Sequence, residues 1–111
     1  MTPDEYQKAA ARTLVKSPPR EYKAWEVMLI WCAMGLAGEA GEAADDAKKA
    51  IFHDVGVDPP RIIKELGDVM WYVAGICSVL GISLESVMSQ NIKKLEIRYP
   101  DGFVPGGGRR E

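Results

Sequence analysis

The stretch that decides the fold runs from residue 62 to residue 80 and reads IIKELGDVMWYVAGICSVL. On a helical wheel at about 100° per residue, its apolar side chains form one stripe. The stripe comprises Ile62, Leu66, Val69, Val73, Ile76 and Leu80. Glu65 falls inside this apolar arc, Asp68 lies at its edge, and Tyr72 sits between the two. Because an unpaired charge is costly to remove from water, a cationic side chain, a proton or a metal ion must compensate Glu65.

A second stretch, GLAGEAGE at residues 35–42, repeats this layout. Glu39 and Glu42 lie three residues apart at the margin of an apolar or small-residue face, with Asp46 close by. That face comprises Leu29, Cys32, Leu36, Ala40, Ala43 and Ala47. The three glycines Gly35, Gly38 and Gly41 indicate that another backbone packs close to this helix, or that the helix bends.

Packed together, the two helices would gather four like charges, and a hard divalent cation relieves such repulsion. We therefore expect Glu39, Glu42, Glu65 and Asp68 to hold Mg²⁺, for which Mn²⁺ could substitute. The alternative is that Glu39 and Glu42 face water while Glu65 pairs with a lysine.

Local signals place four helices along the chain. The predicted ranges are Pro3–Val15 with Thr2 as N-cap, Glu21–Phe52, Arg61–Leu80 ending at Gly81, and a last helix capped by Ser83 that ends before Pro100. No strand-like alternation competes, so we predict an all-α fold, a four-helix bundle completed by oligomerisation. Residues 1–104 form the predicted domain, and the Gly-rich tail 105–111 is expected to be flexible.

The composition limits the function classes. A chain of 111 residues builds only a small core, and it carries three Trp and four Tyr, which favours an oligomer. The net charge of −2 gives no reason to expect nucleic-acid or anionic-membrane binding, and no apolar run looks long enough to span a bilayer. Without an apolar signal region at residues 1–10, a cytoplasmic protein is the default expectation, with Cys32 and Cys77 as reduced core thiols.

The last helix carries a basic face. Asn91, Lys94 and Arg98 are spaced three and four residues apart, so they share one side of the helix. A Lys and an Arg aimed at a carboxylate-metal cluster would suit a polyphosphate, whereas the alternative is a solvated face near a helix C-terminus. A di-iron site of the Glu-x-x-His type is excluded, because His53 is the only histidine and Ala50 stands three residues before it.

Three stretches together resemble the MazG-like nucleoside triphosphate pyrophosphohydrolases: residues 35–42, residues 65–72 (ELGDVMWY) and residues 91–100 (NIKKLEIRYP). The family signature is ExxE, a spacer and ExxD, and here 22 residues separate Glu42 from Glu65. The likeness covers about Tyr6 to Phe103.

The resemblance implies an all-α pyrophosphatase fold, a dimer or a dimer of dimers, and Mg²⁺ on the four carboxylates. It also implies that Tyr72, Asn91, Lys94 and Arg98 lie near the triphosphate. Many members carry a further Glu before the first ExxE glutamate, where this chain has Gly38. Our choice for the general base is therefore Glu39 or Glu42.

We expect hydrolysis of (d)NTPs to monophosphate and pyrophosphate, in a house-cleaning role. The rival readings are an all-α dUTPase, an enzyme like phosphoribosyl-ATP pyrophosphohydrolase, and a non-enzymatic helical module that binds a partner protein.

Overall fold

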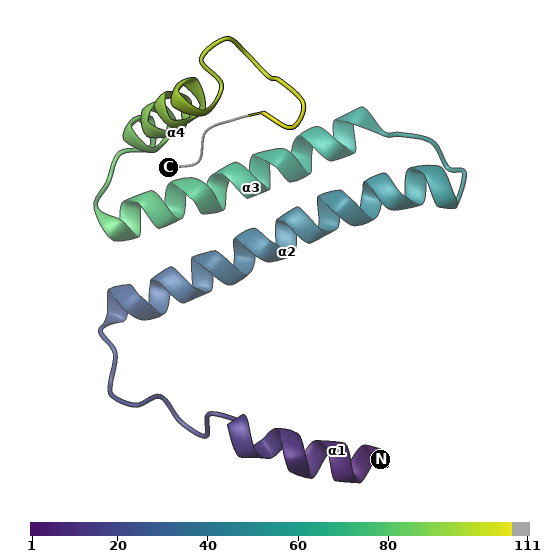
Figure 1. The fold of residues 1–111 in the computed structure, drawn as a ribbon, viewed down its shortest axis with the longest axis vertical. Coiled ribbons are helices and arrows are strands. Elements are labelled where there is room, and N and C mark those ends of the chain that lie inside the picture. The colour runs from purple at the N-terminus through teal and green to yellow at the C-terminus, as the bar shows by residue number, and fades with distance from the viewer. Residues whose placement is uncertain (108–111) are drawn as a thin grey trace.

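The computed structural model describes residues 1–107, and within them it contains helices and no strand (Figure 1). The α-helices are α1 (Pro3–Ala10), α2 (Ala24–Phe52), α3 (Pro59–Leu80) and α4 (Leu84–Arg98), with a short 3₁₀ helix, η1, at Ala11–Thr13. The predicted all-α class is confirmed. Most of the predicted flexible tail, residues 108–111, lies outside the described residues.

Several helix ends follow the capping signals of the sequence. Thr2 Oγ1 accepts the N–H of Glu5 at 3.1 Å, while the Glu5 carboxylate accepts the N–H of Thr2 at 2.9 Å. Gly81 ends α3 with a φ of 67°, which glycine adopts without steric cost. Ser83 Oγ then accepts the N–H of Ser86 at 3.0 Å and starts α4.

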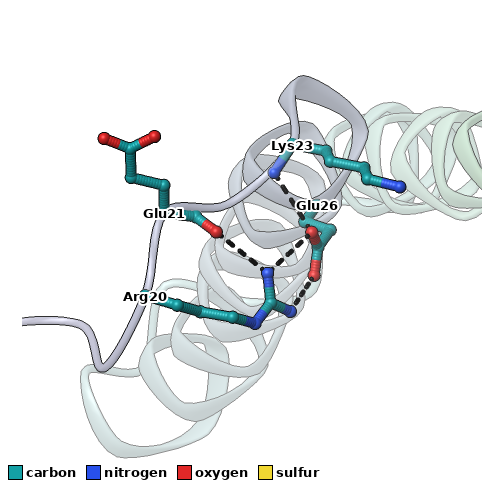
Figure 2. Close-up of polar contacts among 4 residues, drawn as sticks. All are labelled: Arg20, Glu21, Lys23 and Glu26. Atoms are coloured by element: carbon teal, nitrogen blue, oxygen red, sulfur yellow. Dashed lines mark hydrogen bonds and ion pairs between the residues drawn. The ribbon is translucent and has the colours of Figure 1, made fainter.

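The start of α2 lies three residues later than the predicted Glu21 because polar contacts hold the preceding chain extended (Figure 2). The Glu26 carboxylate accepts the N–H of Lys23 at 3.1 Å and an N–H of Arg20 at 2.9 Å. Arg20 also donates to the carbonyl of Glu21 at 2.9 Å. The helix therefore begins at Ala24, one residue after the capped Lys23.

Helices α2 and α3 form an antiparallel hairpin with one constant register (Figure 1). Facing residues have numbers that add to 107, namely Cys32 and Gly75, Gly35 and Tyr72, Glu39 and Asp68, Glu42 and Glu65, and Asp46 and Arg61. Along α2 these positions alternate in steps of three and four residues, the spacing by which one side of a helix meets a neighbouring helix. We call each facing pair a rung.

Gly35 sets how closely the two helices approach. A Cβ atom there would overlap Cε1 and Cζ of Tyr72, whose ring is in turn 5.7 Å from that of Trp31 and 5.0 Å from that of Trp71. Gly38 and Gly41 meet no other group of the described chain at the Cβ position. Of the three spaced glycines, therefore, only Gly35 admits a neighbour within the chain, and that neighbour is a side chain.

Within residues 1–107, α2 and α3 alone pack along their length, so this part of the chain is open in shape. Its radius of gyration is 20.0 Å, whereas about 13 Å is typical of a compact domain of this size. Helix α1 contacts only η1, and α4 turns away from α3 by 106° (Figure 1). Among the described residues only Cys32, Ala50, Cys77 and Glu65 are buried, and both cysteines are free thiols, as predicted.

Helix α2 is also long and apolar enough to cross a membrane by length and composition alone. It has 29 residues and an 18-residue window with a mean hydropathy of 1.2. The expectation that no apolar run could span a bilayer missed this helix, because its apolar residues are interrupted by glycines and charged residues. That window lies near the N-terminus and is 6 % buried in this structure. The core helix of a soluble protein and a signal sequence both pass the same test.

The glycine contact gives a first prediction. We predict that Gly35→Ala lowers the free energy of unfolding by about 1–3 kcal/mol, because the added methyl group clashes with Tyr72. Gly67→Ala, a helical position with open space at Cβ, is the control and should stabilise the protein by up to about 1 kcal/mol. Chemical denaturation measures both, and equal effects of the two substitutions would contradict the assigned hairpin register.

Candidate metal centre

The structure brings together all four carboxylates of the ExxE and ExxD motifs. Glu39 faces Asp68 and Glu42 faces Glu65 on two successive rungs of the α2–α3 hairpin. Each carboxylate acts electrostatically on at least one other member of the set, so the four form one acidic cluster. That this cluster binds a metal ion stays a prediction.

Glu65 is the buried member of the cluster. It is 9 % exposed, in agreement with its position inside the apolar arc of α3. A proton shared with the Asp46 carboxyl, then burial, then the charges of Asp46 and Glu42 raise the pKa of Glu65 to about 7, while Arg61 opposes the rise. Near neutral pH this carboxyl therefore exchanges a proton readily, and a cation could take that proton's place.

Glu39 is perturbed in the same direction. Partial burial, followed by the charges of Glu42 and Asp68, raises the pKa of Glu39 above its ordinary value. A carboxylate with a raised pKa is a better acceptor for a proton from water than an ordinary surface carboxylate is. Glu39 therefore remains a candidate for the general base, and the choice between Glu39 and Glu42 stays a prediction.

Within residues 1–107, no group of three or more His, Cys, Asp or Glu side chains is already arranged closely enough to hold a metal ion. The donor chemistry nevertheless suits Mg²⁺, which prefers carboxylate oxygens. In the same part of the chain, Oε2 of Glu65 is buried without a hydrogen-bond partner. A buried oxygen of this kind is costly unless a proton or a cation satisfies it, so the residues present fit a hard divalent cation.

Asp46 also lies at the site, although it was not among the expected metal ligands. Its side chain is 14 % exposed, and its Oδ2 lies 3.1 Å from Nε of Arg61, close enough for an ion pair although not directed well enough for a hydrogen bond. Asp46 follows Glu42 by four residues and Glu39 by seven, so the helical spacing alone places it on the same face.

Tyr72 lies beside the cluster, and its neighbours fix its position. It follows Asp68 by one turn on α3, and its ring packs against Gly35, which precedes Glu39 by one turn on α2. Its predicted role near a triphosphate stays a prediction.

The basic face of α4 does not meet the carboxylates in this structure. Among the described helices, α4 contacts α3 alone, and it starts at the end of α3 that is remote from the α2–α3 loop (Figure 1). Asn91 and Lys94 line a shallow hollow formed by α4 residues, and Arg98 lies in another, beside Tyr99 and Asp101. If these three residues serve the site, a movement of α4 or a second copy of the chain must bring them there.

His53 caps the end of α2, as expected of a helix-end residue. In this position a histidine can interact with the last carbonyl groups of the helix, and its location gives no reason to add it to the candidate metal ligands.

Comparison with known proteins gives a family match and a similar protein. The family model described as "MazG nucleotide pyrophosphohydrolase domain" matches residues 32–103, a range that includes every carboxylate of the cluster. "Gene 37 protein" of Mycobacterium phage L5 is 38 % identical over 109 residues, which is 95 % of this chain and 95 % of that protein. No solved structure matches the chain.

The raised pKa of Glu65 predicts a pH dependence of stability. Since the folded state holds the proton more tightly than the unfolded state, this contribution is fully present below pH 4.5 and is lost as the pH rises through about 7. Without divalent cations, Glu65→Gln should therefore remove a decrease in Tm between pH 4.5 and 7. Glu85→Gln on α4 is the control, and an unchanged slope in the Glu65 variant would refute the assignment.

Proposed function

The chain belongs to the MazG nucleotide pyrophosphohydrolase family, and on that premise we propose that it is a Mg²⁺-dependent hydrolase of nucleoside triphosphates. The products would be the nucleoside monophosphate and pyrophosphate. The observation that carries this proposal is the acidic cluster of the α2–α3 hairpin, in which Glu39, Glu42, Glu65 and Asp68 face one another across two rungs. A surface helix pair has no evident reason to gather four like charges unless a cationic ligand binds there.

In the proposed reaction Glu39 accepts a proton from the water that attacks the α-phosphorus. The bond between the α-phosphorus and the bridging oxygen breaks, and pyrophosphate leaves with the electron pair. Glu42, Glu65 and Asp68 would hold Mg²⁺, which when bound neutralises phosphate oxygens and acidifies water. Lys94 and Arg98 would stabilise the charge on the leaving pyrophosphate, and Asn91 and Tyr72 would contact the substrate.

We further propose that the working enzyme is an oligomer of this chain, with a homodimer as the smallest form. One chain exposes 9470 Å², whereas about 6,100 Å² is typical of a compact monomer of this mass, an excess of roughly 3,400 Å². Large apolar side chains such as Met34, Ile63 and Met88 are exposed on one chain, and obligate interfaces bury side chains of this kind. A second copy could also supply the Asn91 and Lys94 face that the chain's own cluster does not reach.

A house-cleaning or nucleotide-pool role is proposed with the activity, in the cytoplasm. A phage protein covers almost the same length, which is compatible with a mobile-element origin for such a role. Neither nucleic acid nor a membrane is needed as a partner for this reaction.

The activity has a direct test. We predict that Glu42→Gln and Asp68→Asn each reduce kcat for pyrophosphate release by at least about 100-fold, because each removes a carboxylate from the cluster. Glu85→Gln, on α4, should stay within about twofold of the wild type. Circular dichroism should show an unchanged helical content in all three.

A panel of NTPs, dNTPs, dUTP and phosphoribosyl-ATP with Mg²⁺, analysed for products, separates the proposed function from its rivals. Turnover of several (d)NTPs supports it, and turnover confined to dUTP or to phosphoribosyl-ATP assigns the chain to one of the related hydrolases. Absence of pyrophosphate release from every compound would favour the partner-binding module.

The oligomer makes a separate prediction. Light scattering during size-exclusion chromatography at micromolar concentration should give a mass at least twice the 12.2 kDa of one chain. A monomer with native helical content would contradict the proposed assembly.

A further inference from the structure

The rung formed by Asp46 and Arg61 differs in charge from the two rungs beside it. The Glu39–Asp68 and Glu42–Glu65 rungs place acid against acid, and such pairs repel across the hairpin. The next rung toward the α2–α3 loop places Asp46 against Arg61, with Oδ2 and Nε 3.1 Å apart. An attractive rung therefore stands directly next to the repulsive Glu42–Glu65 rung, and the repulsive Glu39–Asp68 rung follows on the far side of that one.

The Asp46–Arg61 contact is also the ion pair that joins α2 to α3 within residues 1–107. The neighbouring Asp45 pairs instead with Lys48 at 3.2 Å and with Lys49 at 2.8 Å, both on its own helix. The side chain of Asp45 is 41 % exposed, whereas that of Asp46 is 14 % exposed and lies toward α3. Two adjacent aspartates thus occupy different settings, which provides a matched pair for experiments.

We propose that Asp46 and Arg61 form a register lock, which positions Glu65 and keeps the carboxylate rungs opposite each other. The inference rests on the proposed function in one respect, namely that Glu65 is a ligand of the divalent cation. Asp46 is a positioning residue here, since it acts through Glu65 and through the alignment of the two helices.

The alternative register explains why a lock is needed. A slip of one helical turn, about 5.4 Å, would place Glu42 opposite Arg61 and would relieve part of the repulsion between carboxylates. Asp46 opposes this slip, because it already occupies the guanidinium of Arg61 in the observed register. The Asp46 side chain is 14 % exposed and that of Arg61 is 66 % exposed, so the pair is buried on the aspartate side alone. The choice of one helix alignment among several is the best attested use of ionic pairs between helices.

Asp46 also fixes the side chain of Glu65 directly. Glu65 faces Glu42 on its own rung and lies beside the Asp46 carboxyl on the next, and its Oε2 has no hydrogen-bond partner among the described residues. The hydrogen bond between the Asp46 and Glu65 carboxyl groups is therefore the contact that holds the Glu65 side chain in place. Groups that orient a metal ligand in this way typically change metal affinity by 10- to 100-fold when they are removed.

The test is Mn²⁺ binding to the full chain without nucleotide, followed by electron paramagnetic resonance. We expect Asp46→Asn to weaken binding at least tenfold and Arg61→Gln to weaken it severalfold. Asp45→Asn removes the same charge one residue away and should stay within about twofold. The double variant Asp46→Asn with Arg61→Gln should bind no more weakly than Asp46→Asn alone, because both substitutions break the same contact.

A purely structural role would give a different pattern. In that case Asp46→Asn would lower Tm but leave the Mn²⁺ dissociation constant unchanged at a temperature where circular dichroism shows the native helix content. That result, or an equal loss of affinity in Asp45→Asn, overturns the register lock. Arg61→Lys keeps the positive charge and should restore binding to within about threefold of the wild type, which keeps the test decisive if Arg61→Gln fails to fold.

The same Mn²⁺ measurements distinguish a failure of the proposed function from a failure of the register lock. If the wild type binds no Mn²⁺, or if Glu65→Gln binds it as tightly as the wild type does, the assignment of the cation site is wrong and the lock has no ligand to position. If the wild type binds Mn²⁺ through Glu65 and Asp46→Asn binds it equally well, only the register lock is wrong.

Discussion

Repulsion between carboxylates across the α2–α3 hairpin is the constraint on which the candidate site depends. Two rungs oppose acid with acid, and one of these acids, Glu65, is buried at 9 % exposure. This repulsion contributes to the raised pKa values of Glu39 and Glu65. The contacts that join the two helices favourably include the packing of Tyr72 on Gly35, the aromatic rings around Tyr72 and the Asp46–Arg61 ion pair.

Uncharged packing contacts and charged contacts occupy different parts of the hairpin. The rungs toward the start of α2, which contain Cys32 with Gly75 and Gly35 with Tyr72, pack closely and without charge. The rungs beyond them carry the acidic cluster, and the ion pair follows before the loop. A site in which like charges repel, bordered on both sides by favourable contacts, is a common arrangement in proteins that bind ions or catalyse reactions.

Much of the fold could be predicted from the sequence because its signals are local. The Thr2 cap, the Gly81 stop and the Ser83 cap depend on a few consecutive residues, and so does the apolar arc that predicted the burial of Glu65. The start of α2 was misplaced because Arg20 and Glu26 interact across six residues, a contact that no capping rule at Glu21 reveals. The Asp46–Arg61 pair and the 106° turn before α4 depend on how helices meet, and a helical wheel holds no such information.

The central claim is that the acidic cluster exists to hold divalent cations, and a crystal structure grown with Mn²⁺ and a non-hydrolysable nucleotide analogue tests it most directly. The account predicts anomalous scattering peaks between α2 and α3, within coordination distance of the carboxylates of Glu42, Glu65 and Asp68. Peaks confined to other parts of the surface, with these carboxylates turned to separate patches of solvent, would contradict it.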